Sequence, residues 1–205
     1  MPNFSYEDAA LARGHGVICG IDEAGRGPWA GPVVAGAVIL DRLSLPSDLM
    51  ADLDDSKKLK AGRREELLQR LIPHARIGVG RAEVDEIDTI NILQATMLAM
   101  ARAVEDLGDS PGFALVDGNR APDLTMPVEC VVKGDGKSLS IAAASIVAKV
   151  TRDRIMAVLS RTHPAYGWER NAGYGTKEHQ TALAAFGVTP EHRKSYAPIK
   201  KILGL

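Results

Sequence analysis

Two adjacent carboxylates, Asp22 and Glu23, directly follow an apolar run at 17–21. A glycine-rich turn comes next, and a second apolar run, 32–40, leads away from it. This pattern predicts a β-hairpin whose first strand ends on the acidic pair. Because side chains alternate across a strand, the two carboxylates start on opposite faces. A turn or bulge just after them could bring both toward one metal site.

Two further carboxylates repeat this arrangement. Asp117 and Asp135 each lie at the end of an apolar run and next to glycine. Ligands bind beyond the carboxyl ends of parallel strands, so the four carboxylates are expected to converge at one edge of a sheet. Such a concentration of like charge requires cations, and hard oxygen ligands favour Mg²⁺ or Mn²⁺. Two ions of this kind, bound together, are suited to hydrolysis of a phosphodiester.

Each acidic position has an ordinary structural explanation when taken alone. Exposed carboxylates are common, and Asp-Gly is a common turn sequence. The coincidence of three acidic strand ends favours a metal site over three unrelated turns. The chain contains no H-E-x-x-H, G-x-S-x-G or paired C-x-x-C motif that would indicate another chemistry.

The string Asp-Glu-Ala-Gly-Arg-Gly-Pro at 22–28 resembles the signature of the ribonuclease HII family, the type 2 ribonucleases H. Further strings that resemble this family lie along most of the chain, at 55–59, 91–95, 116–119, 133–135, 145–153, 173–176 and 192–196. The resemblance implies an endonuclease that cuts RNA in RNA–DNA hybrids and on the 5′ side of single ribonucleotides in duplex DNA. It implies two-metal-ion catalysis that leaves 3′-OH and 5′-phosphate ends.

The resemblance also implies roles for individual residues. The catalytic, metal-binding set would be Asp22, Glu23, Asp117 and Asp135. The ribose 2′-OH would be read by Gly25, Arg26 and Gly27, together with Tyr174. A contact with the 2′-OH is what distinguishes RNA from DNA, and glycines allow a backbone to approach a ligand closely.

Basic residues gather in two places that flank this expected site, although the net charge of the chain is only −1. The first cluster is Lys57, Lys58, Lys60, Arg63 and Arg64, and the second is His192, Arg193, Lys194, Lys200 and Lys201. Solvated surface is the usual explanation of such runs. Beside an acidic metal site they would instead track phosphates, with Lys57, Arg193 and Lys194 as the proposed contacts. The main alternative function is a non-catalytic nucleic-acid-binding module, which would have little use for four carboxylates facing a polyanion.

Other features set expectations about partners. The pattern Gln180-x-x-Leu183-x-x-Phe186 loosely matches a sliding-clamp motif, but a core-facing helical stripe is favoured, so a clamp contact is not supported. No membrane-spanning run or secretory signal is present, and both cysteines lie in apolar runs. We therefore expect a cytoplasmic monomer whose partner is nucleic acid.

The elements that must position these residues predict an α/β fold. Strands are expected at 17–22, 32–40 and 75–82 as a meander, with later strands at 113–116 and 128–133. Helices are expected at 62–71, at 90–107, from Ser138 to 160 and from Lys177, whereas 41–55 and 162–174 are expected as loops. The layout is that of a ribonuclease H-like mixed five-stranded sheet with helices on both faces. A catalytic domain would span 1–161, and a small C-terminal helical extension carrying Tyr174 would span 162–205.

Overall fold

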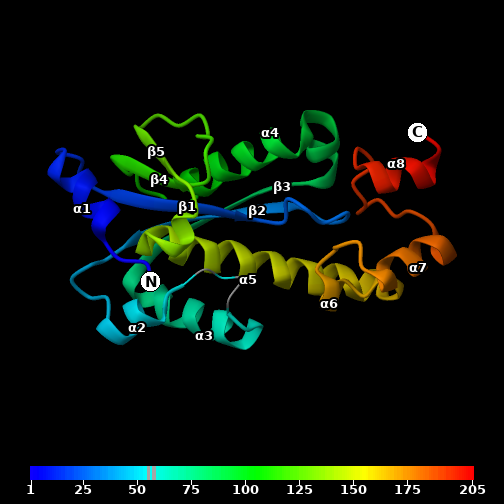
Figure 1. The fold of residues 1–205 in the computed structure, drawn as a ribbon, viewed down its shortest axis with the longest axis horizontal. Coiled ribbons are helices and arrows are strands. Elements are labelled where there is room, and N and C mark those ends of the chain that lie inside the picture. The colour runs from blue at the N-terminus through cyan, green and yellow to red at the C-terminus, as the bar shows by residue number, and fades with distance from the viewer. Residues whose placement is uncertain (55, 57–58) are drawn as a thin grey trace.

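The computed structural model describes residues 1–54, 56 and 59–205. Its centre is one mixed five-stranded sheet with the order β3-β2-β1-β4-β5 (Figure 1). The strands are β1 (Ile18–Ala24), β2 (Val33–Leu40), β3 (Ala75–Ala82), β4 (Phe113–Asp117) and β5 (Val128–Val131). The first three form an antiparallel meander, and β4 and β5 run parallel to β1. The predicted ribonuclease H-like sheet is confirmed.

Two long helices cover opposite faces of this sheet (Figure 1). Helix α4 (Val84–Glu105) packs on β3 and β2, and α5 (Leu139–Thr162) packs on β1 and β2. Glycines let the helix backbones come close: a Cβ at Gly36 would lie 2.7 Å from the Ala144 carbonyl oxygen, and one at Gly80 would lie 2.1 Å from that of Ala99. Ser138 caps α5 as predicted, accepting a hydrogen bond from the Ile141 amide at 3.2 Å.

Three segments differ from the predicted elements. A helix, α2 (Ser47–Asp52), lies inside the predicted loop 41–55, where buried Leu49 anchors it against the core. Helix α4 begins six residues before the predicted start at 90 and is kinked at Asn91, whose φ is +68°. The predicted loop 162–174 contains a 3₁₀ turn, η3 (Pro164–Tyr166), and the short helix α6 (Trp168–Asn171).

The remaining elements complete the covering of the sheet. They are α1 (Ser5–Ala12), α3 (Ala61–Leu71), η1 (Ile72–His74), η2 (Gly134–Gly136), α7 (Lys177–Phe186) and α8 (Ala197–Leu203). The C-terminal helices pack on the far end of α5 around Met156, Trp168, Leu183 and Ile199 (Figure 1). The division into domains at 161 and 162 stays a prediction. Among the described residues, no helix has the length and apolar character needed to cross a membrane.

Candidate active site

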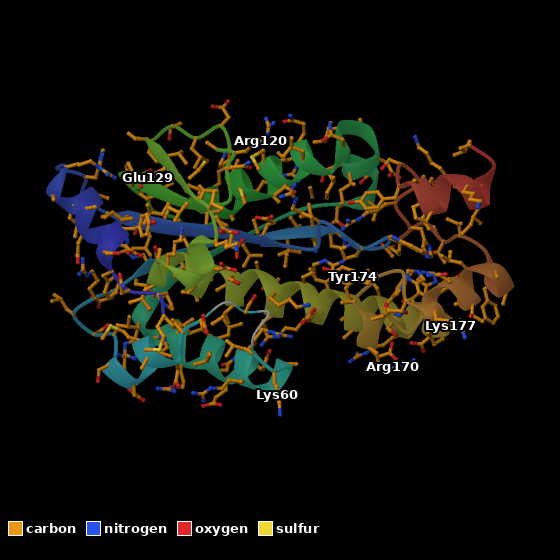
Figure 2. The ribbon with its side chains drawn as sticks, viewed as in Figure 1. Lys60, Arg120, Glu129, Arg170, Tyr174 and Lys177 are labelled. Carbon is orange, nitrogen blue, oxygen red and sulfur yellow. The ribbon has the colours of Figure 1, made fainter. Side chains whose placement is uncertain are left out.

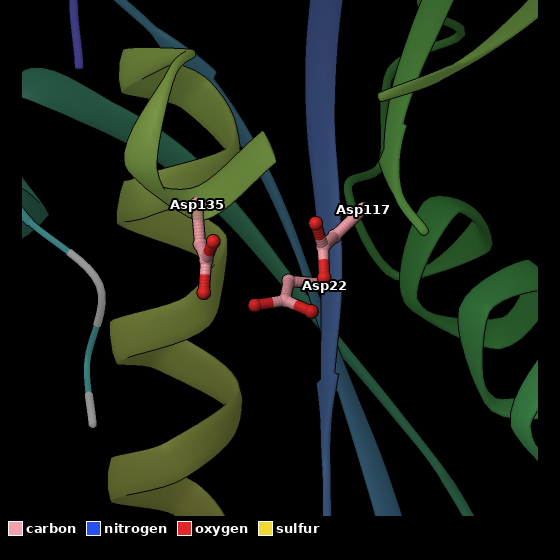
Figure 3. A group of neighbouring side chains, drawn as sticks. All are labelled: Asp22, Asp117 and Asp135. Atoms are coloured by element: carbon pink, nitrogen blue, oxygen red, sulfur yellow. The ribbon is translucent and has the colours of Figure 1, made fainter. Parts of the chain in front are cut away.

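Three of the predicted carboxylates meet at one edge of the sheet. Asp22 lies in β1, Asp117 ends the neighbouring parallel strand β4, and Asp135 lies in η2 before α5. One carboxylate oxygen from each residue lies within 4.8 Å of the other two. Figure 3 shows the three side chains turned toward one another from these elements. The prediction that acidic strand ends converge is therefore correct for Asp22, Asp117 and Asp135.

Backbone amides hold these side chains in place. Asp117 accepts a hydrogen bond from the Gly134 amide at 2.6 Å, and Asp135 accepts one from the Gly136 amide at 2.9 Å. The first bond ties the end of β4 to the turn that carries Asp135. A Cβ at Gly134 would lie 2.6 Å from the end of the Ile141 side chain, so a larger residue there would require Ile141 to shift.

Glu23 lies next to this group but is not one of the three residues whose carboxylate oxygens lie within 4.8 Å of one another. The register of β1 with β2 runs unbroken through Glu23 and Ala24, yet Glu23 lines the same cavity as Asp22 and Asp117. Its carboxylate accepts a hydrogen bond from Arg26 at 3.3 Å. Burial raises the pKa of Glu23, and the Arg26 guanidinium opposes that rise. A direct metal-binding role for Glu23 stays a prediction.

The donor set fits a hard divalent cation. Asp22 and Asp135 are 3% and 6% exposed, so their charges lie largely out of water. Carboxylate oxygens are the ligands that Mg²⁺ and Mn²⁺ prefer, and three of them converge here. The described residues thus provide three carboxylate ligands for a divalent ion.

A cavity of about 390 Å³ joins the carboxylates of Asp22, Glu23 and Asp117 to the predicted substrate-reading residues. Asp22, Asp117, Tyr174 and the turn at Gly25, Arg26 and Gly27 (the 25–27 turn) all line it. Tyr174 lies near the centre of the molecule, beside α5 and α6 (Figure 2), and is 49% exposed. A Cβ placed on Gly27 would lie 3.4 Å from its ring, so the ring and the turn are neighbours.

The predicted second basic cluster is not a single surface patch. Arg193 and His192 are fully buried, whereas Lys194 is exposed. The Arg193 guanidinium donates to the carbonyl of Gly25 at 2.6 Å and to that of Arg26 at 3.0 Å. The expectation that Arg193 tracks phosphates with its own side chain is therefore wrong: it binds the 25–27 turn from behind.

The arginines of the first predicted basic cluster are paired with carboxylates and do not form a free basic surface. Arg64 is buried and pairs with Asp153 at 3.2 Å, and Arg63 pairs with Asp52 and Glu66 at 2.5 Å. Lys60 is exposed at the start of α3 (Figure 2). Two further basic residues, Arg170 in α6 and Lys177 in α7, lie at the C-terminal helices (Figure 2). The predicted phosphate contact Lys57, with Lys58, lies outside the described residues.

Arg152 is a residue of the site that the sequence analysis did not single out. It is 1% exposed, and its guanidinium donates to the carbonyls of Ala30, Pro32 and Ala172 at 2.9 to 3.1 Å. Burial lowers its pKa to about 10, so it remains charged near neutral pH. One feature of the sequence does indicate its burial: Arg152 lies one turn after a helix segment that is apolar on all sides. Lys149, one turn earlier, lines the same cavity.

A sequence profile of the family described as Ribonuclease HII matches residues 19–198. The chain belongs to the ribonuclease HII family. A ribonuclease HII of Paramagnetospirillum magneticum is 62% identical over 188 residues, which cover 92% of this chain and 94% of that protein. Another, of Ruegeria pomeroyi, is 55% identical over 203 residues, covering 98% and 85%.

Solved structures agree with this membership. The ribonuclease H2 of Pyrococcus horikoshii superposes with a TM-score of 0.74 at 29% identity, covering 90% of this chain and 96% of that one. A chain from the PCNA:RNase HII complex of Archaeoglobus fulgidus gives 0.72 at 28% identity, covering 88% and 95%. As a member of the ribonuclease HII family with an acidic triad, the chain is a divalent-metal-dependent ribonuclease H that acts on nucleic acid. The alternative of a non-catalytic binding module is set aside.

Proposed function

We propose that this enzyme cuts the RNA strand of RNA–DNA hybrids and also cuts duplex DNA on the 5′ side of a single embedded ribonucleotide. The observation that carries this proposal is the single cavity that joins the carboxylates to the 25–27 turn and Tyr174. A reacting phosphodiester and the sugar next to it would occupy the two ends of that cavity together.

Asp22, Asp117 and Asp135 would hold two Mg²⁺ or Mn²⁺ ions, with Glu23 completing the set. When bound, such ions lower the pKa of an attacking water and neutralise the charge that develops on the phosphate oxygens. The carboxylates themselves supply fixed negative charge and orient the ion sites. Backbone hydrogen bonds to Asp117 and Asp135 keep that orientation before substrate arrives.

The 25–27 turn is fixed in an orientation suited to reading a hydroxyl. Within each planar peptide the C=O and N–H groups point in opposite directions. Because Arg193 binds the Gly25 and Arg26 carbonyls, the following N–H groups, those of Arg26 and Gly27, face away from its guanidinium. We infer that these N–H groups meet the ribose 2′-OH, while the Tyr174 ring packs on the adjoining sugar.

In this scheme the 2′-OH is recognised but does not attack. A 2′-OH is adjacent to the phosphate on its own 3′ side, and its attack there would leave a cyclic phosphate. Attack by water on the 5′-side phosphate breaks the bond from phosphorus to the preceding 3′ oxygen. That reaction leaves a 3′-OH on one product and a 5′-phosphate on the ribonucleotide.

The proposed partner of the enzyme is nucleic acid. Lys194 and Lys57 would contact phosphates, and Arg193 would act through the 25–27 turn. We propose a monomer that works in the cytoplasm, where its nucleic-acid substrates occur. A clamp contact is not part of the proposal: Leu183 of the weak motif is buried and the Gln180 side chain donates to the Gly175 carbonyl at 2.7 Å. Phe186 is 69% exposed, so the expectation of a fully core-facing stripe is wrong at that residue.

The test is cleavage of a DNA duplex that carries one ribonucleotide, with the product ends mapped. We expect a cut on the 5′ side, ends with 3′-OH and 5′-phosphate, and no cleavage of the all-DNA duplex. A cyclic phosphate product, or equal cleavage of the all-DNA duplex, would contradict the proposal.

A further inference from the structure

A chain of hydrogen bonds through two buried histidines ends on the backbone of Tyr174. The Thr189 amide donates to Nδ1 of His192 at 3.0 Å. Nε2 of His192 lies 2.9 Å from Nε2 of His179, and Nδ1 of His179 lies 2.9 Å from the Tyr174 carbonyl oxygen. Both imidazoles are fully buried. The four residues Thr189, His192, His179 and Tyr174 are called the histidine chain below.

The two ends of the histidine chain determine where its protons lie. A backbone N–H can only donate, so Nδ1 of His192 accepts and its proton lies on Nε2. A carbonyl can only accept, so Nδ1 of His179 carries a proton and its Nε2 accepts from His192. The Trp168 indole N–H, 3.3 Å away, also points at this Nε2. Both rings are therefore neutral, and a proton added to His179 would set N–H groups against one another.

The segment that the histidine chain supports has an unfavourable backbone conformation. Ala172 has a φ of +48° and Gly173 one of +81°, directly before Tyr174. A non-glycine residue in this region needs surrounding structure to hold it. Arg152 binds the Ala172 carbonyl at 2.9 Å, and His179 binds the carbonyl of Tyr174. The ring of Tyr174 is half-exposed, whereas the backbone that carries it is fixed by hydrogen bonds from the buried side chains of Arg152 and His179.

The segment 192–195 supports both parts of the reading surface, which we define as the Tyr174 ring and the 25–27 turn. His192 belongs to the histidine chain, and the next residue, Arg193, binds the 25–27 turn. Asp88 of α4 accepts hydrogen bonds from the Lys194 and Ser195 amides at 2.9 and 2.8 Å, which anchors this segment to the sheet domain. The ring and the turn are therefore positioned from one piece of backbone.

We propose that His179 and His192 are positioning residues for single-ribonucleotide recognition, because as a neutral hydrogen-bonded pair they fix the Tyr174 backbone and with it the ring. This inference rests on the proposed reading role of Tyr174. A single ribonucleotide offers one 2′-OH and one correctly placed sugar, so its cleavage depends on exact placement of the ring. A continuous hybrid offers neighbouring riboses that tolerate a shifted ring.

The surroundings keep the pair neutral at ordinary pH. Burial and the neighbouring His179 lower the pKa of His192 to about 4, and burial lowers the pKa of His179. Among the described residues, the carboxylate that acts on His179 is that of Glu178, which pairs with Arg170. The titratable and aromatic groups that face the pair from the adjoining elements are His163, Tyr166, Trp168, Glu178 and the Trp29 ring.

The kinetic test compares kcat/KM on two substrates, a DNA duplex with one ribonucleotide and a continuous hybrid. Both reactions use the same metal chemistry. The ratio of the single-ribonucleotide rate to the hybrid rate therefore reports recognition of the single ribonucleotide. We expect His179→Leu to lower the single-ribonucleotide rate about tenfold and the hybrid rate by less than about twofold. His179→Asn, whose side-chain amide can donate to the Tyr174 carbonyl, should recover most of that loss. His163→Asn, in the same aromatic cluster but outside the histidine chain, should leave the ratio unchanged.

The pH profile gives a readout that a merely structural role would not move. Neutral rings are required, and lowered pKa values keep them neutral as the pH falls below the ordinary histidine value of about 6.5. The wild-type ratio should stay level down to about pH 6 and fall between about pH 6 and 4. In the His179→Asn, His192→Asn double variant that fall should disappear. A wild-type ratio that stays level to about pH 4 would overturn the proposal.

Nitrogen chemical shifts of the wild-type histidines test the arrangement without any activity. We expect a proton on Nδ1 of His179 and on Nε2 of His192 at neutral pH. Any other pair of tautomers, or a charged ring, would overturn the inference even if all variants fail to fold. If Tyr174→Ala loses both activities equally, the proposed reading role fails instead. Equal losses in His179→Leu beside a selective loss in Tyr174→Ala would overturn the positioning role alone.

Discussion

The carboxylate site and the layer beneath the reading surface solve opposite electrostatic problems. Asp22, Asp117 and Asp135 bring negative charges together within 4.8 Å. Around the 25–27 turn and Tyr174, Arg152, Arg193 and the histidine pair are buried, and the two guanidinium groups donate to backbone carbonyls. The carboxylate group concentrates negative charge that a bound cation would neutralise. In the second group, the N–H donors are already hydrogen-bonded to acceptors within the protein.

This difference indicates a division of labour. Crowded carboxylates are destabilising until cations arrive, so the site is completed by its ligand. The support layer, which we define as Arg152, His179, His192 and Arg193, is complete beforehand and holds the reader rigid. We therefore expect changes at the carboxylates to affect chemistry on every substrate, and changes in the support layer to affect substrate choice and stability.

The largest effect is expected at the carboxylates. Asp22→Asn, Asp117→Asn or Asp135→Asn removes a charge and a hard ligand but little volume. Each should lower kcat by at least about 100-fold on both substrates. In metal-free buffer the melting temperature should stay level or rise, because like charges are relieved. Asp123→Asn, at an exposed position in the β4–β5 connection, is the matched control. Near-normal rates in two of the three variants would show that the metal site is wrong.

The second-largest effect is expected for Arg193→Met. This variant should lower both the free energy of unfolding and the ratio of single-ribonucleotide cleavage to hybrid cleavage. It leaves the carbonyls of Gly25, Arg26 and Gly31 without their guanidinium donor. The bond to Gly31 is buried and the bond to Gly25 partly buried, whereas the Arg26 carbonyl still accepts a hydrogen bond from the Tyr196 hydroxyl. Because an unpaired buried acceptor costs about 1–3 kcal/mol, we expect a loss of about 1–3 kcal/mol of unfolding free energy. Denaturant unfolding measures this loss. Lys194→Met, at the exposed neighbouring position, should change stability by less than about 0.5 kcal/mol. Similar stability losses for both variants would contradict the support role of Arg193.

Tyr174 should have a smaller and selective effect. Tyr174→Ala removes the ring and should reduce single-ribonucleotide cleavage about tenfold more than hybrid cleavage. Tyr174→Phe keeps the ring, so any further difference measures the hydroxyl. Parallel kcat/KM measurements on the two substrates separate these contributions. An equal loss on both substrates would assign Tyr174 to general positioning.

The smallest effect is expected from exposed charge. Lys194→Ala should weaken duplex binding about twofold to fivefold for every sequence, and should reduce the slope of log affinity against log salt by about one. Arg76→Ala on β3, where Arg76 pairs with Asp109, is the control on an ordinary surface. An unchanged slope would place Lys194 among solvated surface residues.

The two regions also differ in how far sequence could predict them. Asp22, Asp117 and Asp135 were predictable because apolar runs mark strands and parallel neighbours end at one edge. The position of Glu23 was harder to predict, because alternation along β1 places it opposite Asp22 and local sequence does not reveal how it reaches the same cavity. The fold class followed from the same apolar runs, but helix α2 did not, because its burial rests on tertiary contacts of Leu49.

The support layer was not predictable in the same way. His192, Arg193 and Lys194 are adjacent polar residues, and such a run ordinarily indicates solvent exposure. Arg193 is buried because its donors find the carbonyls of Gly25 and Arg26, more than 160 positions away in the chain. That pairing is created by the fold and leaves no periodic signal in either segment.

The most direct test of the division of labour is a Mn²⁺ titration of both cleavage rates, in the wild type and in Tyr174→Ala. Free metal controls occupancy of the carboxylate site, whereas the ratio of the two rates reports the reading surface. Our account predicts that both wild-type rates rise together, with a constant ratio at every Mn²⁺ concentration. In Tyr174→Ala the ratio should be shifted by the same factor throughout the titration. A ratio that changes with Mn²⁺ in the wild type would contradict the account, because metal binding and substrate choice would then share one structural basis.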